Sequence, residues 1–362
     1  MGAETGRRGY LDWARGLAVL IMIQAHVLDS WTRVDARGTW QYAWAMIVAG
    51  FGAPMFLFLA GVSLPLSAGS KLRRGGDARA AASAVTKRGL WILFLAFLFR
   101  VQSWILGWGP PRTLLKVDIL NVMGPAIAIT GLIWAIGLTA RARAWVFGLV
   151  ATAMAMVTPI VRASPLVDRL PIWFQWYVRP AGEFTTFTLF PWAGFVFAGA
   201  AVGALVADLR ADAAERRLQI GFGIAGALLI AGGFVAAAQP SIYRSSSFWT
   251  SSPTWFAVRT GILMIALAMC YAAVSLRVFG SSWQAPLARM GRASLFIYWI
   301  HVELVYGYAS WLWRGELPLW AAVAAFMAFC VVMYGAIELR DRVVANWRRI
   351  SAGNPQLKEE AS

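Results

Sequence analysis

Residues 12–34 read DWARGLAVLIMIQAHVLDSWTRV, a largely apolar run that is interrupted by charged and titratable side chains. An α-helix needs about 20 predominantly apolar residues to cross the hydrocarbon core of a bilayer. Similar runs recur along the chain, and we predict about ten spans, near residues 16–34, 41–66, 89–108, 119–138, 145–161, 187–207, 219–238, 256–276, 293–312 and 318–337. The predicted fold class is all-α, a polytopic membrane helical bundle with about ten transmembrane helices.

The composition agrees with this prediction, because 59% of the 362 residues are hydrophobic and only 14% are charged. These proportions exclude a soluble α/β enzyme and a secreted disulfide-rich scaffold. The two cysteines, Cys270 and Cys330, both fall inside apolar spans, where a thiol packs as a small hydrophobic group. We therefore predict neither a disulfide nor a metal site.

The net charge of +16 is explained by membrane topology, and we predict no nucleic-acid partner. With both termini in the cytoplasm, the inner side carries roughly twice as many Lys and Arg residues as the outer side, as the positive-inside rule requires. The segment 71–88 is the most basic inner loop. We expect a multi-pass protein of a bacterial cytoplasmic (inner) membrane.

One membrane domain over residues 1–350 is predicted, because no repeat or flexible linker divides the chain. Residues 351–362 are predicted to form a mobile cytoplasmic tail. The second span contains five helix-breaking residues: Gly50, Gly52, Pro54, Gly61 and Pro65. We expect this span to be kinked and to lie in the interior of the bundle, where neighbours satisfy the freed backbone groups.

The first span carries a polar stripe, whose members are Asp12, Arg15, His26, Asp29 and Arg33. At about 100° per residue these side chains fall within an arc of roughly 100°, so they share one helix face. Arg15 and His26 lie about 16 Å apart along the axis at 1.5 Å per residue. A long ligand could therefore enter from the cytoplasm with its charged part at Arg15 and its reactive end near His26.

Ionisable side chains within a membrane span usually have a functional role, and Asp29 at i+3 from His26 could orient the imidazole and stabilise its protonated form. The alternative is a set of interhelical hydrogen bonds. The other histidine, His301, lies in the ninth span and shares a helix face with Tyr298. For His301 a structural and a functional role stay equally open.

The run from Leu11 to Gly16, which contains Asp12 and Arg15 and is followed ten residues after Arg15 by His26, resembles the opening of transmembrane acyltransferases. The greatest resemblance is to bacterial relatives of heparan-alpha-glucosaminide N-acetyltransferase, with the acyltransferase-3 family as a more distant relative. Three further segments are similar: 52–64, 118–124 and 294–307. A membrane family of unknown function shares the Asp-x-x-Arg-Gly entry but often lacks the histidine.

The resemblance implies transfer of an acyl group, usually acetyl, from cytoplasmic acyl-coenzyme A to a sugar hydroxyl or amine on the outer side. Acetyl-CoA would be a co-substrate, with no permanently bound cofactor. His26 would take the position of the catalytic histidine, and Arg15 that of its paired arginine. Neutral His26 suits the role of general base. Direct transfer and an acetyl-histidine intermediate both stay open.

Other residues are candidates for binding the two substrates. For the coenzyme we consider Asp12 and a group of arginines on the predicted cytoplasmic side: Arg15, Arg73, Arg74, Arg88, Arg289 and Arg292. For the acceptor we consider Tyr298, His301, Asp118, Asn121, Glu183 and Arg259. Most of the 20 tryptophans lie toward the outer face, where indoles could stack on sugars or form an interfacial belt.

Two other functions are compatible with the same features. A transporter or flippase for a small polar or glycan-linked substrate would also need a polar stripe and broken helices. A membrane scaffold without chemistry is a third reading, against which the presence of both Arg15 and His26 argues. The expected partners are the bilayer, acyl-CoA and a sugar or glycan acceptor, and a homodimer is compatible with the sequence.

Overall fold

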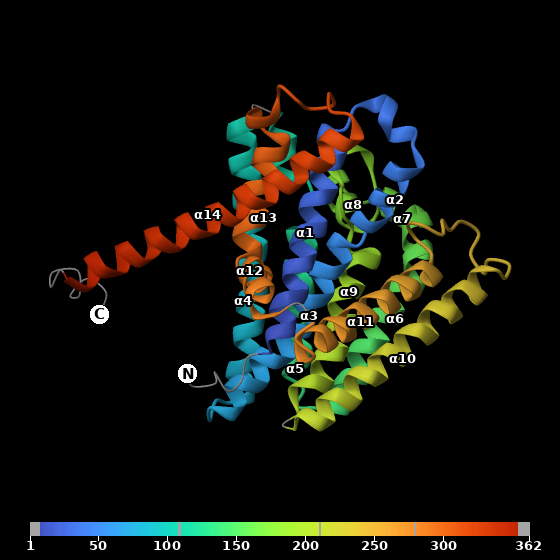
Figure 1. Cartoon of the computed structure of the whole chain (residues 1–362). Coiled ribbons are helices and arrows are strands. Elements are labelled where there is room, and N and C mark those ends of the chain that lie inside the picture. The colour runs from blue at the N-terminus through green and yellow to red at the C-terminus, as the bar shows by residue number, and fades with distance from the viewer. Residues whose placement is uncertain (1–7, 108–109, 210, 279, 354–362) are drawn as a thin grey trace. The chain divides into compact units, whose positions relative to one another are not determined.

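The computed structural model describes residues 8–107, 110–209, 211–278 and 280–353. Its helices are α1 (Gly9–Trp31), η1 (Val34–Gly38), α2 (Trp40–Ala49), α3 (Gly52–Arg73), α4 (Ala78–Gly107), η2 (Pro111–Leu115), α5 (Ile119–Trp134), α6 (Ala140–Ala163), α7 (Pro165–Asp168), α8 (Ile172–Val178), η3 (Gly182–Phe184), α9 (Leu189–Ala207), α10 (Asp212–Ala237), α11 (Pro253–Ser275), α12 (Gly280–Arg292), α13 (Ser294–Tyr306), η4 (Tyr308–Ser310) and α14 (Leu319–Gly353). Figure 1 shows these helices, and the described residues form no β-strand. The predicted all-α fold class is confirmed.

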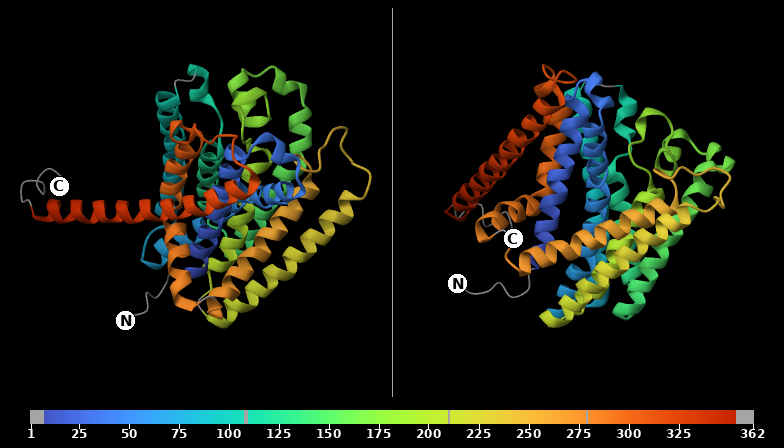
Figure 2. Two further views of the ribbon diagram at one scale, coloured as in Figure 1. Left: turned by 45° about the horizontal axis from the view of Figure 1, so that its top comes forward. Right: turned by 45° about the vertical axis from the view of Figure 1, so that its right-hand side comes forward.

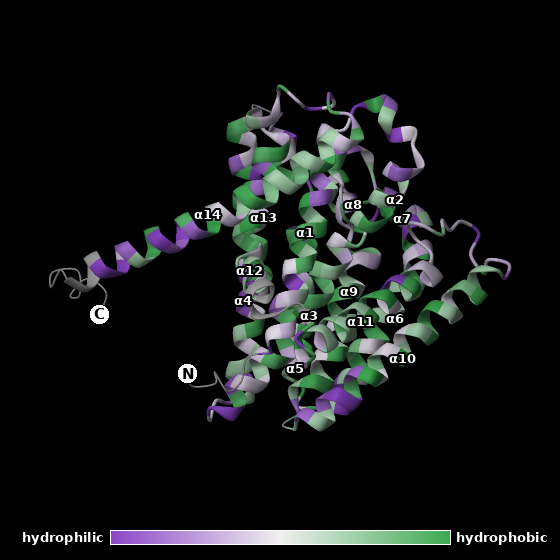
Figure 3. Ribbon diagram, in the orientation of Figure 1, coloured by the Kyte–Doolittle hydropathy of each residue, from purple (hydrophilic) through white to green (hydrophobic). Residues whose placement is uncertain are grey.

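Nine of the ten predicted spans each overlap one long or apolar helix, and the second span covers the two helices α2 and α3. Eight of these segments are long and apolar enough to cross a membrane, and the other two, α5 and α13, are shorter apolar helices. Figure 3 shows the long apolar surfaces of the helices, with hydrophilic residues gathered mainly toward helix ends and loops. The chain is a multi-pass membrane protein. The orientation with both termini in the cytoplasm stays a prediction.

The second span is broken, as its glycines and prolines predicted. Its first part forms α2, Gly50 and Phe51 form a turn outside either helix, and the second part forms α3. Residues on several sides of α3 are buried, including Leu57, Phe58 and Val62. The helix therefore lies in an interior position.

The described chain divides into two compact units. Unit 1 contains the described residues up to Ala14 together with Phe51–Val278, and unit 2 contains Arg15–Gly50 together with the described residues from 280 onward. Helix α1 contributes its first turns to unit 1 and the rest to unit 2. The prediction of one domain over residues 1–350 stays a prediction.

Unit 1 is built from helix pairs that pack along their lengths: α3 with α9, α4 with α5, α6 with α9, and α10 with α11. Both views of Figure 2 show α10 and α11 side by side. Glycines allow close approach of α3 to α9, because a Cβ added at Gly61 would overlap the carbonyl oxygen of Val196 and one added at Gly199 would overlap that of Phe58. Small residues at such crossings are typical of membrane helix pairs, which gain stability from close van der Waals packing.

Unit 2 includes most of α1, then α2, α12, α13 and α14. Helix α14 has 35 residues, so it extends about 52 Å at 1.5 Å per residue and exceeds a hydrocarbon core of about 30 Å. Its first part is apolar, and its last part mixes hydrophilic and hydrophobic residues (Figure 3). The predicted tail overlaps α14 at residues 351–353, and residues 354–362 lie outside the described residues.

A single methyl group at the crossing of α3 and α9 should destabilise the protein. We expect Gly199→Ala to lower the free energy of unfolding by about 1 to 3 kcal/mol or more, because the helices must separate to admit the Cβ. Gly223→Ala in α10 is the matched control, since nothing lies within 4 Å of the added Cβ. Thermal unfolding of both variants in detergent measures the difference, and equal melting temperatures would contradict the packing described.

Candidate functional site

The two histidines of the chain form a hydrogen-bonded pair within unit 2. His26 Nδ1 lies 2.7 Å from His301 Nε2, and the two rings stack with centroids 5.0 Å apart and planes 8° from parallel. His301 is fully buried, with 0% of its surface exposed, whereas His26 is partly exposed. His26 is therefore the member of the pair that a substrate could reach.

Hydrogen bonds one turn away fix the register of α1 against α13. The carbonyl oxygen of Val305 accepts from Ser30 Oγ at 3.1 Å, from Trp31 Nε1 at 3.1 Å and from Ser310 Oγ at 2.6 Å. Ser30 is four residues after His26, and Val305 is four residues after His301. The helices thus run parallel at this point, and the contact that holds Ser30 against Val305 also brings the imidazoles together.

The partners of His301 determine the tautomers of both rings. His301 Nδ1 lies 2.8 Å from the carbonyl oxygen of Ile297, which can only accept a hydrogen bond, so Nδ1 carries the proton. In neutral His301, Nε2 is then a bare acceptor, and His26 must donate from Nδ1. Neutral His26 consequently has its lone pair on Nε2. This chain of bonds leaves His26 Nε2 as a basic nitrogen.

Aromatic and charged residues surround the pair. The Tyr306 ring meets His26 edge-on with centroids 5.5 Å apart, and its hydroxyl donates to Asp29 Oδ2 at 2.9 Å. The Tyr298 ring lies 5.9 Å from that of His301. Asp29 therefore contacts Tyr306, while the direct hydrogen-bond partner of His26 is His301. The predicted role of Asp29 toward the imidazole stays a prediction. Tyr306 was not among the predicted site residues.

The predicted coenzyme-binding residues are distributed over both units. Arg15 and Asp12 lie on α1, where Asp12 is buried and Arg15 is partly exposed, and each makes polar or charged interactions. Arg73, Arg74 and Arg88 are exposed in unit 1, and Arg292 is exposed in unit 2.

Arg289, in unit 2, already forms ion pairs with carboxylates of α14, at 3.2 Å to Glu338 and 3.0 Å to Asp341.

One polar cavity of about 570 Å³ lies in unit 1 at the ends of α3, α5 and α9 and the beginnings of α6 and α10. Its charged lining residues are Arg8, Arg73, Arg143, Asp208, Asp212 and Glu215. Arg8 pairs with Glu215 at 2.8 Å, and Arg73 donates to the carbonyl of Ala207 at 3.2 Å. Of the predicted coenzyme-binding residues, Arg73 lines this cavity.

Asp118 and Asn121 belong to a second polar cluster, which lies in unit 1 at the start of α5. Asp118 caps the helix by accepting from the backbone N–H of Leu120 at 3.0 Å, while Asn121 Oδ1 accepts from the backbone N–H of Asp118 at 3.1 Å. Arg100, the cation within α4, forms an ion pair with Asp118. The polar partner of Arg100 is thus supplied by the loop that precedes α5.

Further residues of this cluster come from two loops. Tyr177 accepts from Asn121 Nδ2 at 3.2 Å, and burial raises the pKa of its hydroxyl. Burial, together with the charge of Arg100, lowers the pKa of Lys116. The backbone of Val117 donates to Phe184 at 2.9 Å, which brings the segment of exposed Glu183 to the cluster. Three predicted acceptor-binding residues (Asp118, Asn121 and Glu183) are therefore close in space, and Tyr177 joins them.

The ion pair between Arg100 and Asp118 should contribute strongly to stability. We expect Asp118→Asn to lower the free energy of unfolding by roughly 3 kcal/mol or more, because it leaves a largely buried guanidinium without its counter-ion. Asp168→Asn is the matched control, since Asp168 pairs with Arg179 while 61% of its side chain is exposed. Chemical unfolding should separate the two variants, and equal losses would argue against the ion pair as the cause.

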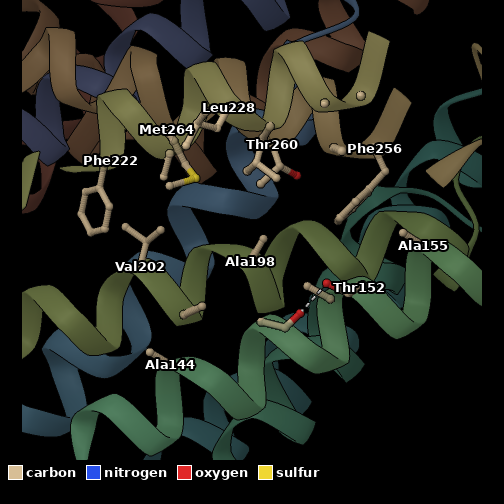
Figure 4. A pocket seen from close by; sticks show the side chains of 18 of the residues that line it. Ala144, Thr152, Ala155, Ala198, Val202, Phe222, Leu228, Phe256, Thr260 and Met264 are labelled. Atoms are coloured by element: carbon tan, nitrogen blue, oxygen red, sulfur yellow. Dashed lines mark hydrogen bonds between the residues drawn. The ribbon is translucent and has the colours of Figure 1, made fainter. Parts of the chain in front are cut away.

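A large apolar cavity of unit 1 does not contain the predicted chemistry. It has a volume of about 900 Å³ and is bounded by α6, α9, α10 and α11, with lining residues such as Val202, Phe222, Phe256 and Met264 (Figure 4). Thr152, on its wall, donates to the backbone carbonyl of Gly148 at 2.9 Å. Its lining contains no histidine or carboxylate, so the histidine pair is the better candidate for a catalytic centre.

Comparison with protein families gives a match over more than half of the chain. Residues 7–233 match the family model described as "Heparan-alpha-glucosaminide N-acetyltransferase, catalytic". The match includes Arg15, His26 and Asp118, while Arg259 and His301 lie beyond it. A comparison with curated proteins finds no match.

Proposed function

Because the chain belongs to the family of heparan-alpha-glucosaminide N-acetyltransferase catalytic domains and is thus a membrane acyltransferase, we propose that it acetylates a sugar. The donor is acetyl-CoA on the cytoplasmic side, and the acceptor is a hydroxyl or amine of a sugar or glycan on the outer side. The observation that supports this proposal best is the pair of His26 and His301, which leaves a basic nitrogen on the partly exposed ring.

The proton of the acceptor is taken by His26 Nε2. As the acceptor oxygen or nitrogen attacks the thioester carbonyl carbon, the new C–O or C–N bond forms and the C–S bond breaks. His26 Nε2 then gives its proton to the departing thiolate, so that free CoA leaves as a thiol. General-base assistance of this kind typically contributes 10²- to 10⁴-fold to a rate.

His301 acts through His26 and is therefore a positioning residue. It holds the ring of His26 in one tautomer and one orientation by accepting from Nδ1. When His26 becomes protonated, the bond from its Nδ1 to the neutral Nε2 of His301 stabilises the imidazolium. His301 is itself fixed by Ile297, so the pair needs no rearrangement during transfer.

Arg15 is proposed to bind a phosphate of the donor. It lies on the same helix as His26 and about 16 Å from it along the axis at 1.5 Å per residue. This separation suits a donor whose anionic part and reactive thioester lie at opposite ends of an extended arm. Guanidinium groups bind phosphates through two parallel hydrogen bonds, which also fix the direction of the donor.

Sealed inside-out membrane vesicles that contain the full chain provide the test. Acetyl-CoA labelled in its acetyl group is added outside the vesicles, and a panel of amino and neutral sugars is loaded inside them. We expect release of free CoA and appearance of label on a luminal sugar, neither of which occurs in vesicles that lack the protein. Passage of unmodified sugar without loss of thioester would contradict the proposal and favour a transporter.

A further inference from the structure

Arg259, in unit 1, is a largely enclosed cation that forms no ion pair with a carboxylate of the described residues. It lies near the start of α11, with its Cζ atom 4.9 Å from the ring centroid of Trp255 and 5.7 Å from that of Trp192. Its Nε atom is buried and donates to no acceptor of the described chain. The guanidinium thus lies against two aromatic rings, and no carboxylate of the described residues compensates its charge.

Three other arginines of the unit 1 helix bundle have polar partners. Arg8 is paired with Glu215, and Arg100 is paired with Asp118. Arg162 donates to Thr188 Oγ1 at 3.0 Å and to the carbonyl oxygen of Phe190 at 2.8 Å, at the start of α9. Arg259 differs from these three because indole faces are its recorded contacts. Arg143 also lies over an indole, that of Trp134, but it shares its cavity with the carboxylate of Asp208. A desolvated charge without an ionic partner is strongly unfavourable.

Another donor beside Arg259 also lacks an acceptor. The indole Nε1 of Trp255 is buried and makes no hydrogen bond within the described chain, although its ring contacts the guanidinium. An indole nitrogen and a guanidinium can only donate hydrogen bonds. The groups left unsatisfied at this place are therefore donors, and the partner that satisfies them must supply acceptors and negative charge.

This site is separate from the apolar cavity. Phe256 and Thr260 of α11 line that cavity (Figure 4), whereas Trp255 and Arg259, four residues apart, lie about 100° around the helix from them. The indole of Trp192, on α9, borders the guanidinium from the other helix. An anion bound here would lie beside a flat aromatic face, which suits an anionic group attached to a sugar ring.

We propose that Arg259 and Trp255 bind an oxyanion, a carboxylate or a phosphate, carried by a small organic ligand, with Trp192 in contact with the body of that ligand. Such an anion would satisfy the guanidinium and the indole N–H together. We further identify this ligand as the acceptor of the acetyl group, so that the acceptor is an acidic sugar. This identification rests on the acetyl transfer proposed above. The binding site itself does not depend on that reaction.

Equilibrium binding to the full chain in nanodiscs tests the site without any thioester. The probes are methyl glucuronide for the carboxylate, glucose 1-phosphate for the phosphate and methyl glucoside as the neutral match. We expect at least one acidic probe to bind tenfold or more tightly than methyl glucoside, and Arg259→Gln to remove that preference. Arg244→Gln, which changes an exposed arginine in the segment before α11, should leave it unchanged.

Thermal unfolding of Arg259→Met supplies a second measurement. Without ligand, this variant should melt at a higher temperature than the wild type, because it removes a partly buried charge that has no ionic partner in the described chain. The acidic probe should raise the melting temperature of the wild type and leave that of the variant unchanged. Equal binding of acidic and neutral probes to the wild type, or a lower melting temperature of the ligand-free variant, would overturn the proposal and assign Arg259 a structural role.

Discussion

His26→Ala should abolish acetyl transfer while leaving the protein folded. The alanine removes the nitrogen that we propose takes the acceptor proton, and the loss in kcat should be about 10²- to 10⁴-fold. The KM for acetyl-CoA should change little, because the imidazole acts on the acceptor proton in the transition state. Steady-state release of CoA by purified protein in detergent measures both constants.

Gln24→Ala is a matched control for this variant. Gln24 lies on the same helix, and its Nε2 donates to the carbonyl oxygen of Ala45 at 3.1 Å, so the substitution also removes a polar contact of α1. We expect its kcat to stay within about threefold of the wild type. A His26→Ala protein that turns over acetyl-CoA at the wild-type rate would exclude His26 as the base.

His301→Ala should have the second largest effect, although His301 is buried and beyond reach of a substrate. Without its acceptor, His26 loses its fixed tautomer and the partner that stabilises its protonated form, and we expect kcat to fall by roughly 10²-fold. The KM for acetyl-CoA should remain within about twofold. The ratio of the two changes separates an effect on the chemical step from a general disturbance of substrate binding.

His301→Gln distinguishes positioning from packing. Its side-chain carbonyl can accept the hydrogen bond from His26 Nδ1, so part of the activity lost in His301→Ala should return. If His301 only filled space, the glutamine variant would show no advantage over a leucine variant of similar size. Equal kcat values for His301→Gln and His301→Leu would therefore contradict the positioning role.

The membrane helices could be located from the sequence because each needs a long apolar run, and the break between α2 and α3 was indicated by its glycines and prolines. Short helices such as α7 and α8 were missed because they have only 4 and 7 residues, too few to show a helical period. Helix α12 was missed because its hydrophobic residues cover one side only, so its sequence contains no long apolar run. The extension of α14 to Gly353 was missed because charged residues end the apolar signal well before the helix ends.

The site could be predicted only in part. His26 and His301 were identified because titratable residues are rare in apolar spans, but their contact joins residues 275 positions apart and depends on the register set by Val305. Spacing along one helix suggested Asp29 as the partner of His26, whereas the nearer partner comes from α13. Arg100 and Asp118 were both visible as unusual residues, yet nothing in their spacing linked α4 to the start of α5.

The ring nitrogens of the two histidines provide the most direct test of the account. Because the chain has only two histidines, ¹⁵N-histidine labelling of an untagged protein gives signals from these two rings alone. At neutral pH we predict that both rings are protonated at Nδ1 and bare at Nε2, with a nitrogen–nitrogen coupling across the bond from His26 to His301. A His26 ring protonated at Nε2, or the absence of any coupling between the rings, would contradict the proposed catalytic pair.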